Sequence, residues 1–373
     1  MGSNKEWLLL NLSKEEKVKR IILVTLTVLM VSAIIFGGCA KPAEEAPTTP
    51  TAPAEKPIEW RFCSFDPPQG MIAKPTIAWI KELEEATDGR MKINPYWSES
   101  LVKVAGLFDA VASGTADIGH IVTGPIAERV SLTALSNLPA IFETPHQTGQ
   151  TMMALFNKYE EMREQFAPTK VVWFTNPGPV DIYSNRPVHT LEDLKGLKIA
   201  CTAKYEVLSW EALGGTVVPI SSVEKYHALE TGIIDAGSGD WMELWVWKLY
   251  EVTKYRTGNT TGLIKGAPTA MNIESYNKLP EDIKRIFDEV TAPMTKLANE
   301  SYEKDYFELV EEIREFDKKV GNPEFYYLPA AEKAKWAEVL QPVNLEWVKE
   351  NEAKGYPAGA ILEDAIAFAE QYK

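Results

Sequence analysis

Hydrophobic residues follow two alternating spacings along much of the chain. The apolar stretch 58–65 predicts a strand, and apolar positions three and four apart predict a helix over 75–86. The same reasoning predicts a strand at 91–96, a helix at 104–112 and a strand at 116–122. Strands that alternate with helices in this way are typical of a parallel α/β sheet.

A second region with the same alternation follows in the middle of the chain. Its strands are expected at 171–176, 181–184, 197–201, 217–218 and 233–236, and its main helices at 205–213 and from about 222 to 231. Residues 279–320 predict a long helical region that Pro293 would kink or break. Two α/β units followed by helices favour a clamshell that binds a ligand between the units, at the carboxyl ends of parallel strands.

Short polar motifs locate some of these elements more closely. Thr190, followed three residues later by Asp193, predicts the start of a short helix. Ser221 or Ser222 is expected to cap the helix that runs from about 222 to 231. The Gly-Ser-Gly segment 237–239 is interpreted as a turn or as a close backbone approach, since it lacks the surroundings of a nucleophile elbow.

The first 57 residues differ from this pattern. Basic residues precede the uncharged run 21–36, and small residues then lead to Cys39. This arrangement over residues 1–39 resembles a lipoprotein signal, in which Cys39 would carry the lipid. The uncharged run is shorter than the roughly 20 residues that span a bilayer, although an uncleaved helical anchor is the alternative. Residues 40–57 contain five prolines and predict an extended linker.

Composition and motifs exclude several classes of function. The chain has 373 residues, of which 45% are hydrophobic, and a formal charge of −14, so nucleic acid is not an expected partner. The sequence contains no GxSxG, GxxxxGK[ST], GxGxxG or HExxH motif, so we expect neither an enzyme nor a cofactor. Cys63 and Cys201 are expected as two buried thiols, with a disulfide between them as the alternative.

Four segments carry a resemblance to a known family. They are 110–118 (AVASGTADI), 138–142 (LPAIF), 185–199 (NRPVHTLEDLKGLKI) and 212–236, which includes ALETG and IDA. In this order they resemble the solute-binding proteins of tripartite ATP-independent periplasmic (TRAP) transporters, the DctP family. The resemblance implies an α/β clamshell of two domains with parallel-rich sheets and a long helix spanning both. It also implies an extracytoplasmic protein that captures a small organic solute and delivers it to membrane permease subunits.

The same resemblance divides the folded part into two domains. Residues 58–177 with about 259–300 are expected to form domain I, and residues 178–258 with about 301–373 to form domain II.

An exported sensor that reports its ligand to a separate receptor is the main alternative function, and an exported hydrolase is a further one. A lipid at Cys39 would hold the protein on the membrane outside the cytoplasm.

Two positions depart from the family pattern. Members that bind organic acids usually place an arginine where this chain has Ala200 and another where it has Val180. Without these guanidinium groups a carboxylate would need Lys204, Arg61, Arg186, a metal ion or backbone donors. The alternative is a ligand that is neutral, aromatic or bridged by a metal ion.

Candidate ligand-binding residues follow the expected strands or resemble family positions. They are Asp66, Gln69, Thr123, Trp173, Asn176, Tyr183, Ala200, Thr202, Tyr205, Asp240, Trp241 and Trp245. The pair Asp240-Trp241 resembles an acid-tryptophan pair that contributes to a metal-bridged site in some members. Asp240 is therefore the one residue for which a metal contact is considered, and no metal site is expected otherwise.

Overall fold

The computed structural model describes residues 56–323 and 325–373. The expected signal segment, the lipidation at Cys39 and most of the linker 40–57 lie outside the described residues. Within the described ranges, each helix is too short or too polar to cross a membrane.

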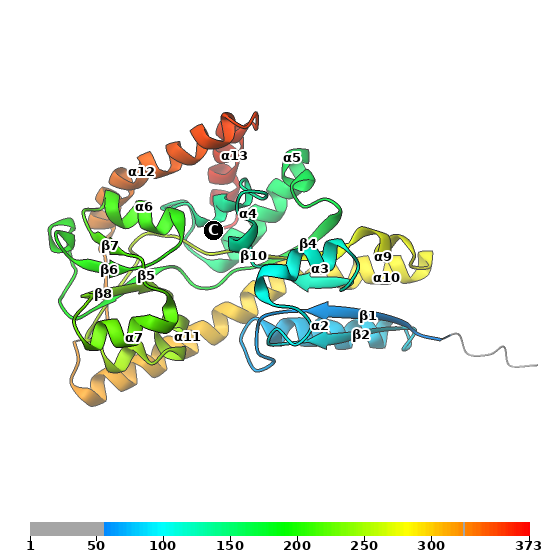
Figure 1. Ribbon diagram of the computed structural model, residues 1–373, viewed down its shortest axis with the longest axis horizontal. Helices are drawn as coiled ribbons and strands as arrows, with labels where there is room; N and C mark the ends of the chain where they lie inside the picture. The colour runs from blue at the N-terminus through cyan, green and yellow to red at the C-terminus, as the bar shows by residue number, and fades with distance from the viewer. Residues whose placement is uncertain (1–55, 324) are drawn as a thin grey trace, which may run out of the picture. The chain divides into compact units, whose positions relative to one another are not determined.

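One sheet has five strands in the order β2-β1-β3-β10-β4 (Figure 1). Its strands are β1 (Ile58–Cys63), β2 (Met91–Tyr96), β3 (Ile118–His120), β4 (Thr169–Thr175) and β10 (Ala267–Asn272). β1 pairs in parallel with β2 and β3, whereas β10 runs antiparallel between β3 and β4. Its helices are α2 (Ala73–Ala86), α3 (Leu107–Ala112), α4 (Pro145–Lys158), α5 (Glu160–Glu164), α9 (Ile273–Asn277) and α10 (Glu281–Thr291). This sheet and these helices are called the first lobe below.

A second sheet has six strands in the order β11-β9-β5-β8-β6-β7. Its strands are β5 (Asp181–Ser184), β6 (Lys198–Ala200), β7 (Thr216–Val218), β8 (Ala236–Gly239), β9 (Tyr255–Gly258) and β11 (Tyr326–Tyr327). β6 is parallel to β7 and β8, while β5 is antiparallel to β8 and β9. With helices α6 (Lys204–Ala212), α7 (Ser222–Glu230) and α8 (Trp241–Val246) it forms the second lobe. The two parallel-rich sheets confirm the expected fold class.

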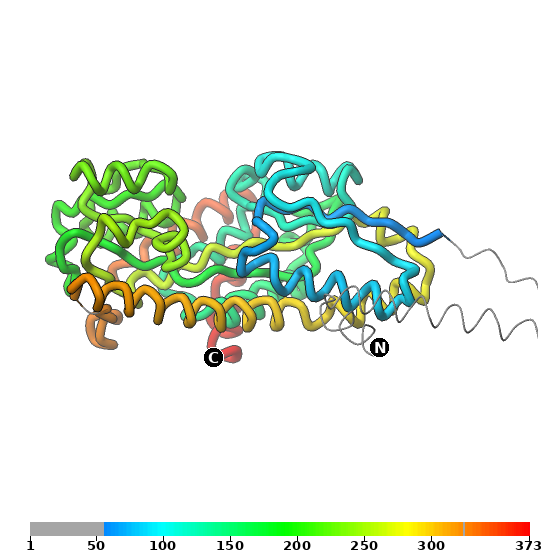
Figure 2. Tube along the Cα trace, turned by 90° about the horizontal axis from the view of Figure 1, so that it is seen from below, coloured from blue at the N-terminus to red at the C-terminus, as the bar shows by residue number. Residues whose placement is uncertain are grey.

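The helix α11 (Met294–Val320) contributes to the cores of both lobes. It has 27 residues and is therefore about 40 Å long, and Figure 2 shows it as the straight helix that runs along both lobes. Met294 and Ala298 pack in a core cluster with Trp60, whereas Tyr302 and Ile313 pack in a cluster of the second lobe. The predicted break at Pro293 is confirmed, because α10 ends before that residue and α11 begins after it.

Two helices complete the described chain. α12 (Ala330–Glu352) contacts α6 of the second lobe, and α13 (Ala358–Gln371) contacts α4 of the first lobe. Ile361 and Ala365 of α13 belong to the same core cluster as Leu155 of α4. The expected domain division assigns residues 301–373 to domain II. Helix α13 belongs to this range but packs on the first lobe, and the division stays a proposal.

Local capping motifs act as predicted, while one strand is shifted. Thr190 with Asp193 and Ser221 with Glu224 form capping boxes at the starts of a 3-10 helix (Leu191–Leu194) and of α7. The strand expected at 233–236 lies further along the chain, because β8 runs from Ala236 to Gly239 and includes the Gly-Ser-Gly segment.

The backbone of the Gly-Ser-Gly segment passes close to the side chain of Tyr183, which agrees with one of the two interpretations of this segment. A Cβ atom on Gly237 would lie 2.1 Å from the Tyr183 ring, so the strand can pass beneath this tyrosine only with glycine there.

Candidate functional site

A pocket of about 550 Å³ lies between the two lobes and is called the main pocket. Its walls are largely apolar and include Phe65, Pro67, Met71, Ile72, Val122, Pro177, Met242, Val246, Trp247 and Tyr302. A second cavity of about 500 Å³, the side pocket, shares part of this wall. The shared residues are Thr123, Gly124, Asn137, Ala203 and Lys265. The two pockets therefore form adjoining parts of one cleft.

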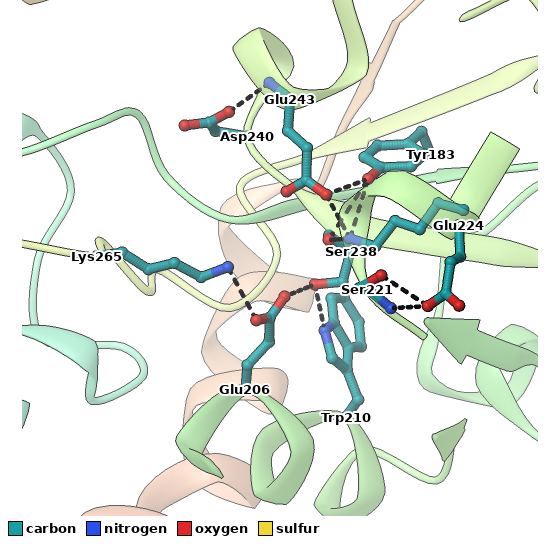
Figure 3. A network of polar contacts seen from close by, with 10 residues as sticks. Tyr183, Glu206, Trp210, Ser221, Glu224, Ser238, Asp240, Glu243 and Lys265 are labelled. Atoms are coloured by element: carbon teal, nitrogen blue, oxygen red, sulfur yellow. Dashed lines mark hydrogen bonds and ion pairs between the residues drawn. The ribbon is translucent and has the colours of Figure 1, made fainter. Parts of the chain in front are cut away.

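A buried ion pair that includes Glu243, which Figure 3 shows beside Tyr183 and Ser238, supports the second-lobe wall of the main pocket. Lys225 Nζ donates to Glu243 Oε1 at 2.6 Å, to the carbonyl oxygen of Ser238 at 2.5 Å and to the Tyr183 hydroxyl at 3.3 Å. The Lys225 side chain is only 3% exposed. Burial alone would raise the pKa of Glu243, but the lysine charges outweigh it and hold that pKa below its usual value. Glu243 is thus held as a carboxylate whose charge Lys225 balances.

Asp240 lies on the pocket wall directly before α8. Its Oδ1 accepts a hydrogen bond from the Glu243 backbone amide at 2.7 Å, so it caps this helix. Burial, together with the charge of Glu243, raises the pKa of Asp240 to about 6. Among the described residues no lysine, arginine or histidine lies in salt-bridge contact with it. The carboxylate therefore faces the pocket without a cationic partner from the chain.

Lys265 is the ammonium group that lines both pockets. Its Nζ lies 3.0 Å from Glu206 Oε2, and its side chain is 40% exposed whereas that of Glu206 is 2% exposed. Glu206 Oε1 also accepts from the Ser238 hydroxyl at 2.5 Å, and Trp210 Nε1 donates to that hydroxyl at 2.7 Å. Burial would lower the pKa of Lys265, but Glu206 and neighbouring carboxylates raise it instead. The lysine is therefore charged, and Glu206 already balances that charge.

His120 and Asp66 form the polar part of the first-lobe wall. His120 Nδ1 lies 2.7 Å from Asp66 Oδ2, which also accepts from the Ser64 hydroxyl at 2.7 Å. The Phe65 ring stacks on the imidazole with centroids 5.6 Å apart. Burial would raise the pKa of Asp66, but His120 and the hydrogen bond from Ser64 outweigh it and lower that pKa. Asp66 is therefore an ionised acceptor for His120.

Five of the candidate residues lie on the pocket walls. Asp66 and Asp240 line the main pocket, Thr123 lines both, and Thr202 and Tyr205 line the side pocket. Each of these five residues follows a strand with a parallel neighbour, and polar residues at such strand ends are expected to face the cleft.

Of the three cations considered for a carboxylate, one reaches the cleft. Lys204 lines the side pocket, but Glu350 binds its ammonium at 2.5 Å. Arg61 instead lies 3.6 Å from Asp117, and Arg186 donates to a backbone carbonyl at 3.4 Å on an exposed surface.

Of the three tryptophans expected to line the pocket, two lie in packed interiors and the third lies outside both pockets. Trp173 is fully buried against Trp79, with ring centroids 5.0 Å apart. Trp241 is 1% exposed and packs edge-on against Phe325. Trp245 stacks on an aromatic ring of the second lobe and does not line either pocket. Apolar spacing cannot distinguish a core aromatic from one that faces a ligand, so this part of the expected site needs correction.

The other candidates lie behind the wall or away from it. Asn176 is buried, and its amide donates to Asn299 Oδ1 at 3.0 Å. Tyr183 and Ala200 are fully buried in the second-lobe core. Gln69 lies exposed in a turn outside the pocket walls. These four do not contact the cleft directly.

The sequence did not single out several residues that the structure brings to the cleft. They are Phe65, His120, Met242, Trp247, Lys265 and Tyr302. For His120 a signal exists, since it ends a strand beside Asp66, whereas Lys265 lies in a connection that has no distinctive pattern.

The described part of the chain holds two free cysteines and no cluster of metal ligands. Within residues 56–323 and 325–373 no cluster of three or more His, Cys, Asp or Glu side chains could hold a metal ion. Cys63 and Cys201 are free and buried, which confirms the expectation of buried thiols, and burial raises their pKa values to about 12.

Comparison with known proteins gives a consistent result. The model of bacterial extracellular solute-binding protein family 7, named DctP, matches residues 64–351. A solute-binding protein of Chromohalobacter salexigens is 26% identical over 201 residues, which span 52% of this chain and 59% of that protein.

Two solved structures share the fold. A TRAP periplasmic solute-binding protein of Desulfovibrio salexigens has a TM-score of 0.77 at 22% identity, covering 85% of this chain and 97% of that one. A TRAP solute-binding protein of Rhodoferax ferrireducens, in complex with copurified benzoate, has a TM-score of 0.73 at 21% identity, covering 84% and 98%.

Proposed function

Because the chain belongs to the DctP family of extracellular solute-binding proteins, we propose that it captures a small organic solute in the main pocket and delivers it to the permease of a TRAP transporter. The family consists of binding proteins rather than enzymes, and its members act outside the cytoplasm. The observation that carries the proposal for this chain is the apolar pocket between the lobes, with its few polar groups.

The size and lining of the main pocket support a small solute. Its volume of about 550 Å³ falls within the usual range of roughly 300–1,000 Å³ for small-molecule sites. Aromatic and aliphatic side chains from both lobes form most of the wall, so a solute with an apolar or aromatic body would displace water from apolar surface. The benzoate complex of the Rhodoferax relative makes an aromatic ring a reasonable first body to test.

Closure of the lobes would complete this site. Val246 and Trp247 line the pocket yet are 62% and 40% exposed, so they have apolar surface left to bury. The chain passes between lobes near Val180, whose amide donates to the carbonyl oxygen of Leu263 at 2.8 Å. These crossing segments and α11 are the proposed hinge, about which the lobes would close over the solute.

The two missing arginines affect which solute is favoured. Ala200 and Val180 are buried, and no arginine of the described ranges lines either pocket. In the main pocket, where Lys265 is the one lining lysine among the described residues, a carboxylate would therefore have to compete with Glu206 for it. A metal-bridged solute would need oxygen atoms of its own beside Asp240, because the described residues offer no complete metal site.

The proposed location is the outer face of a membrane. Lipidation at Cys39 and the linker 40–57 would tether the folded part within reach of a permease. The mass of the mature amino-terminal peptide from cells would test this: a diacylglyceryl group on Cys39 supports the anchor, and an unmodified peptide starting elsewhere contradicts it.

A thermal-shift screen tests solute capture at the main pocket. Purified protein would be screened against organic acids, sugars, amides and aromatic compounds, and a binding solute should raise its melting temperature. Met242→Arg places a long charged side chain in the pocket wall and should abolish that rise. Val223→Arg is the matched control, since Val223 is 67% exposed on α7 away from the pocket. A full rise in Met242→Arg would contradict the proposed site.

A further inference from the structure

We propose that His120 binds the polar head of the solute in the main pocket, and that this head is a hydrogen-bond donor such as a hydroxyl or an amine rather than a carboxylate. The inference rests on the proposed function and specifies the class of solute that this chain accepts.

His120 is placed as a ligand contact. Its side chain lines the main pocket although the residue is only 2% exposed. Its Nε2 is buried and has no hydrogen-bond partner in the described part of the chain, whereas Nδ1 is held by Asp66. A buried nitrogen that lacks a partner, on a residue that lines a cavity, is a group that a bound molecule can satisfy.

Asp66 determines which hydrogen bond Nε2 can make. Asp66 Oδ2 is a carboxylate oxygen 2.7 Å from Nδ1, so Nδ1 must carry the hydrogen of that bond. In a neutral imidazole the other nitrogen then has a free lone pair and accepts a hydrogen bond. The group presented to the pocket is therefore an acceptor, whose complement is an O–H or N–H donor.

The charges around the pocket favour the same kind of solute. Lys265 pairs with Glu206 at 3.0 Å, and Lys225 behind the wall pairs with Glu243 at 2.6 Å. Asp240 remains as a carboxylate without a cation from the described residues. A carboxylate solute would add a further negative charge beside it, whereas an amine or hydroxyl would be attracted.

The remaining wall accommodates an apolar body. Phe65, which stacks on His120, and Trp247 and Tyr302 provide aromatic surface in the same pocket. A phenyl ring carrying a short donor arm combines both requirements.

Three probes that share a phenyl ring test the proposal on the full chain. Isothermal titration at pH 8 with benzyl alcohol, benzylamine and benzoate should give at least tenfold tighter binding of one donor probe than of benzoate. His120→Phe should weaken that donor probe at least tenfold, and His120→Gln, which keeps a polar group, should weaken it less. His227→Phe is the control, because His227 is exposed on α7. Unchanged donor binding in His120→Phe would overturn the proposal.

The outcomes also separate this proposal from the proposed function. If benzoate binds most tightly, or if only non-aromatic solutes of the wider screen bind, the inference about the solute is wrong while solute capture stands. If no solute of the screen binds, the proposed function itself is contradicted.

Discussion

The buried carboxyl group of Asp181 should make the stability of the protein fall as the pH rises. Asp181 begins β5 and is 2% exposed. Its Oδ1 accepts hydrogen bonds from the backbone amide and the hydroxyl of Thr260, both at 3.1 Å. The described residues place no cation in salt-bridge contact with it, and burial raises its pKa from 3.8 to about 7. The folded protein therefore binds this proton more tightly than the unfolded chain does.

The magnitude follows from the difference between the two pKa values. Each pKa unit corresponds to about 1.4 kcal/mol, so a rise from 3.8 to about 7 costs about 4 kcal/mol of stability once the pH exceeds 7. The sign is that of a raised acid: stability is fully present below pH 4 and is lost as the pH rises to about 7. Asp181→Asn keeps an oxygen that can accept from Thr260 and removes the ionisation. The variant should therefore gain stability relative to the wild type as the pH increases.

Urea unfolding at pH 5 and pH 8, followed by tryptophan fluorescence, measures this difference. Between these values the wild type should lose about 3 kcal/mol more of its unfolding free energy than Asp181→Asn does. Asp109→Asn, which changes an exposed residue of α3, should follow the wild type. Equal losses in the wild type and in Asp181→Asn would show that Asp181 does not titrate as a buried acid.

Three further substitutions test the packing around the pocket by urea unfolding. Lys225→Met leaves Glu243 without its buried partner and should cost about 3–5 kcal/mol, part of which Lys225→Met/Glu243→Gln should restore; no recovery in the double variant would argue against the ion pair. Gly237→Ala places a Cβ 2.1 Å from the Tyr183 ring and should cost at least about 1–3 kcal/mol, whereas wild-type stability would refute the close approach. Trp241→Ala should cost about 3–5 kcal/mol because this ring fills the core, and a loss of solute binding at unchanged stability would instead place it in the pocket.

The sequence predicts the fold well where its signals are local. Thr190 with Asp193 and Ser221 with Glu224 satisfy backbone amides within a few residues, so the helix starts that they indicate are confirmed. Pro293 lacks an amide hydrogen, and the helix is interrupted there as expected. β8 is shifted because its glycines carry no hydrophobic signal, and their role depends on Tyr183 from another strand.

The site is less predictable because it is formed by residues that are distant in the sequence. Asp66 follows β1 and His120 ends β3, but their contact depends on the pairing of these two strands. Lys265 reaches the cleft from a connection between lobes, and its partner Glu206 is on α6. Trp173 satisfies the same apolar pattern as a pocket residue would, and only its packing shows that it belongs to the core.

A crystal structure with the solute that gives the largest thermal shift tests solute capture between the lobes most directly. Solute capture between the lobes predicts electron density for the solute in the main pocket, against Phe65 and Tyr302, with a polar atom within hydrogen-bond distance of His120 Nε2. Density for the solute outside the cleft, with the main pocket holding only water, would contradict it.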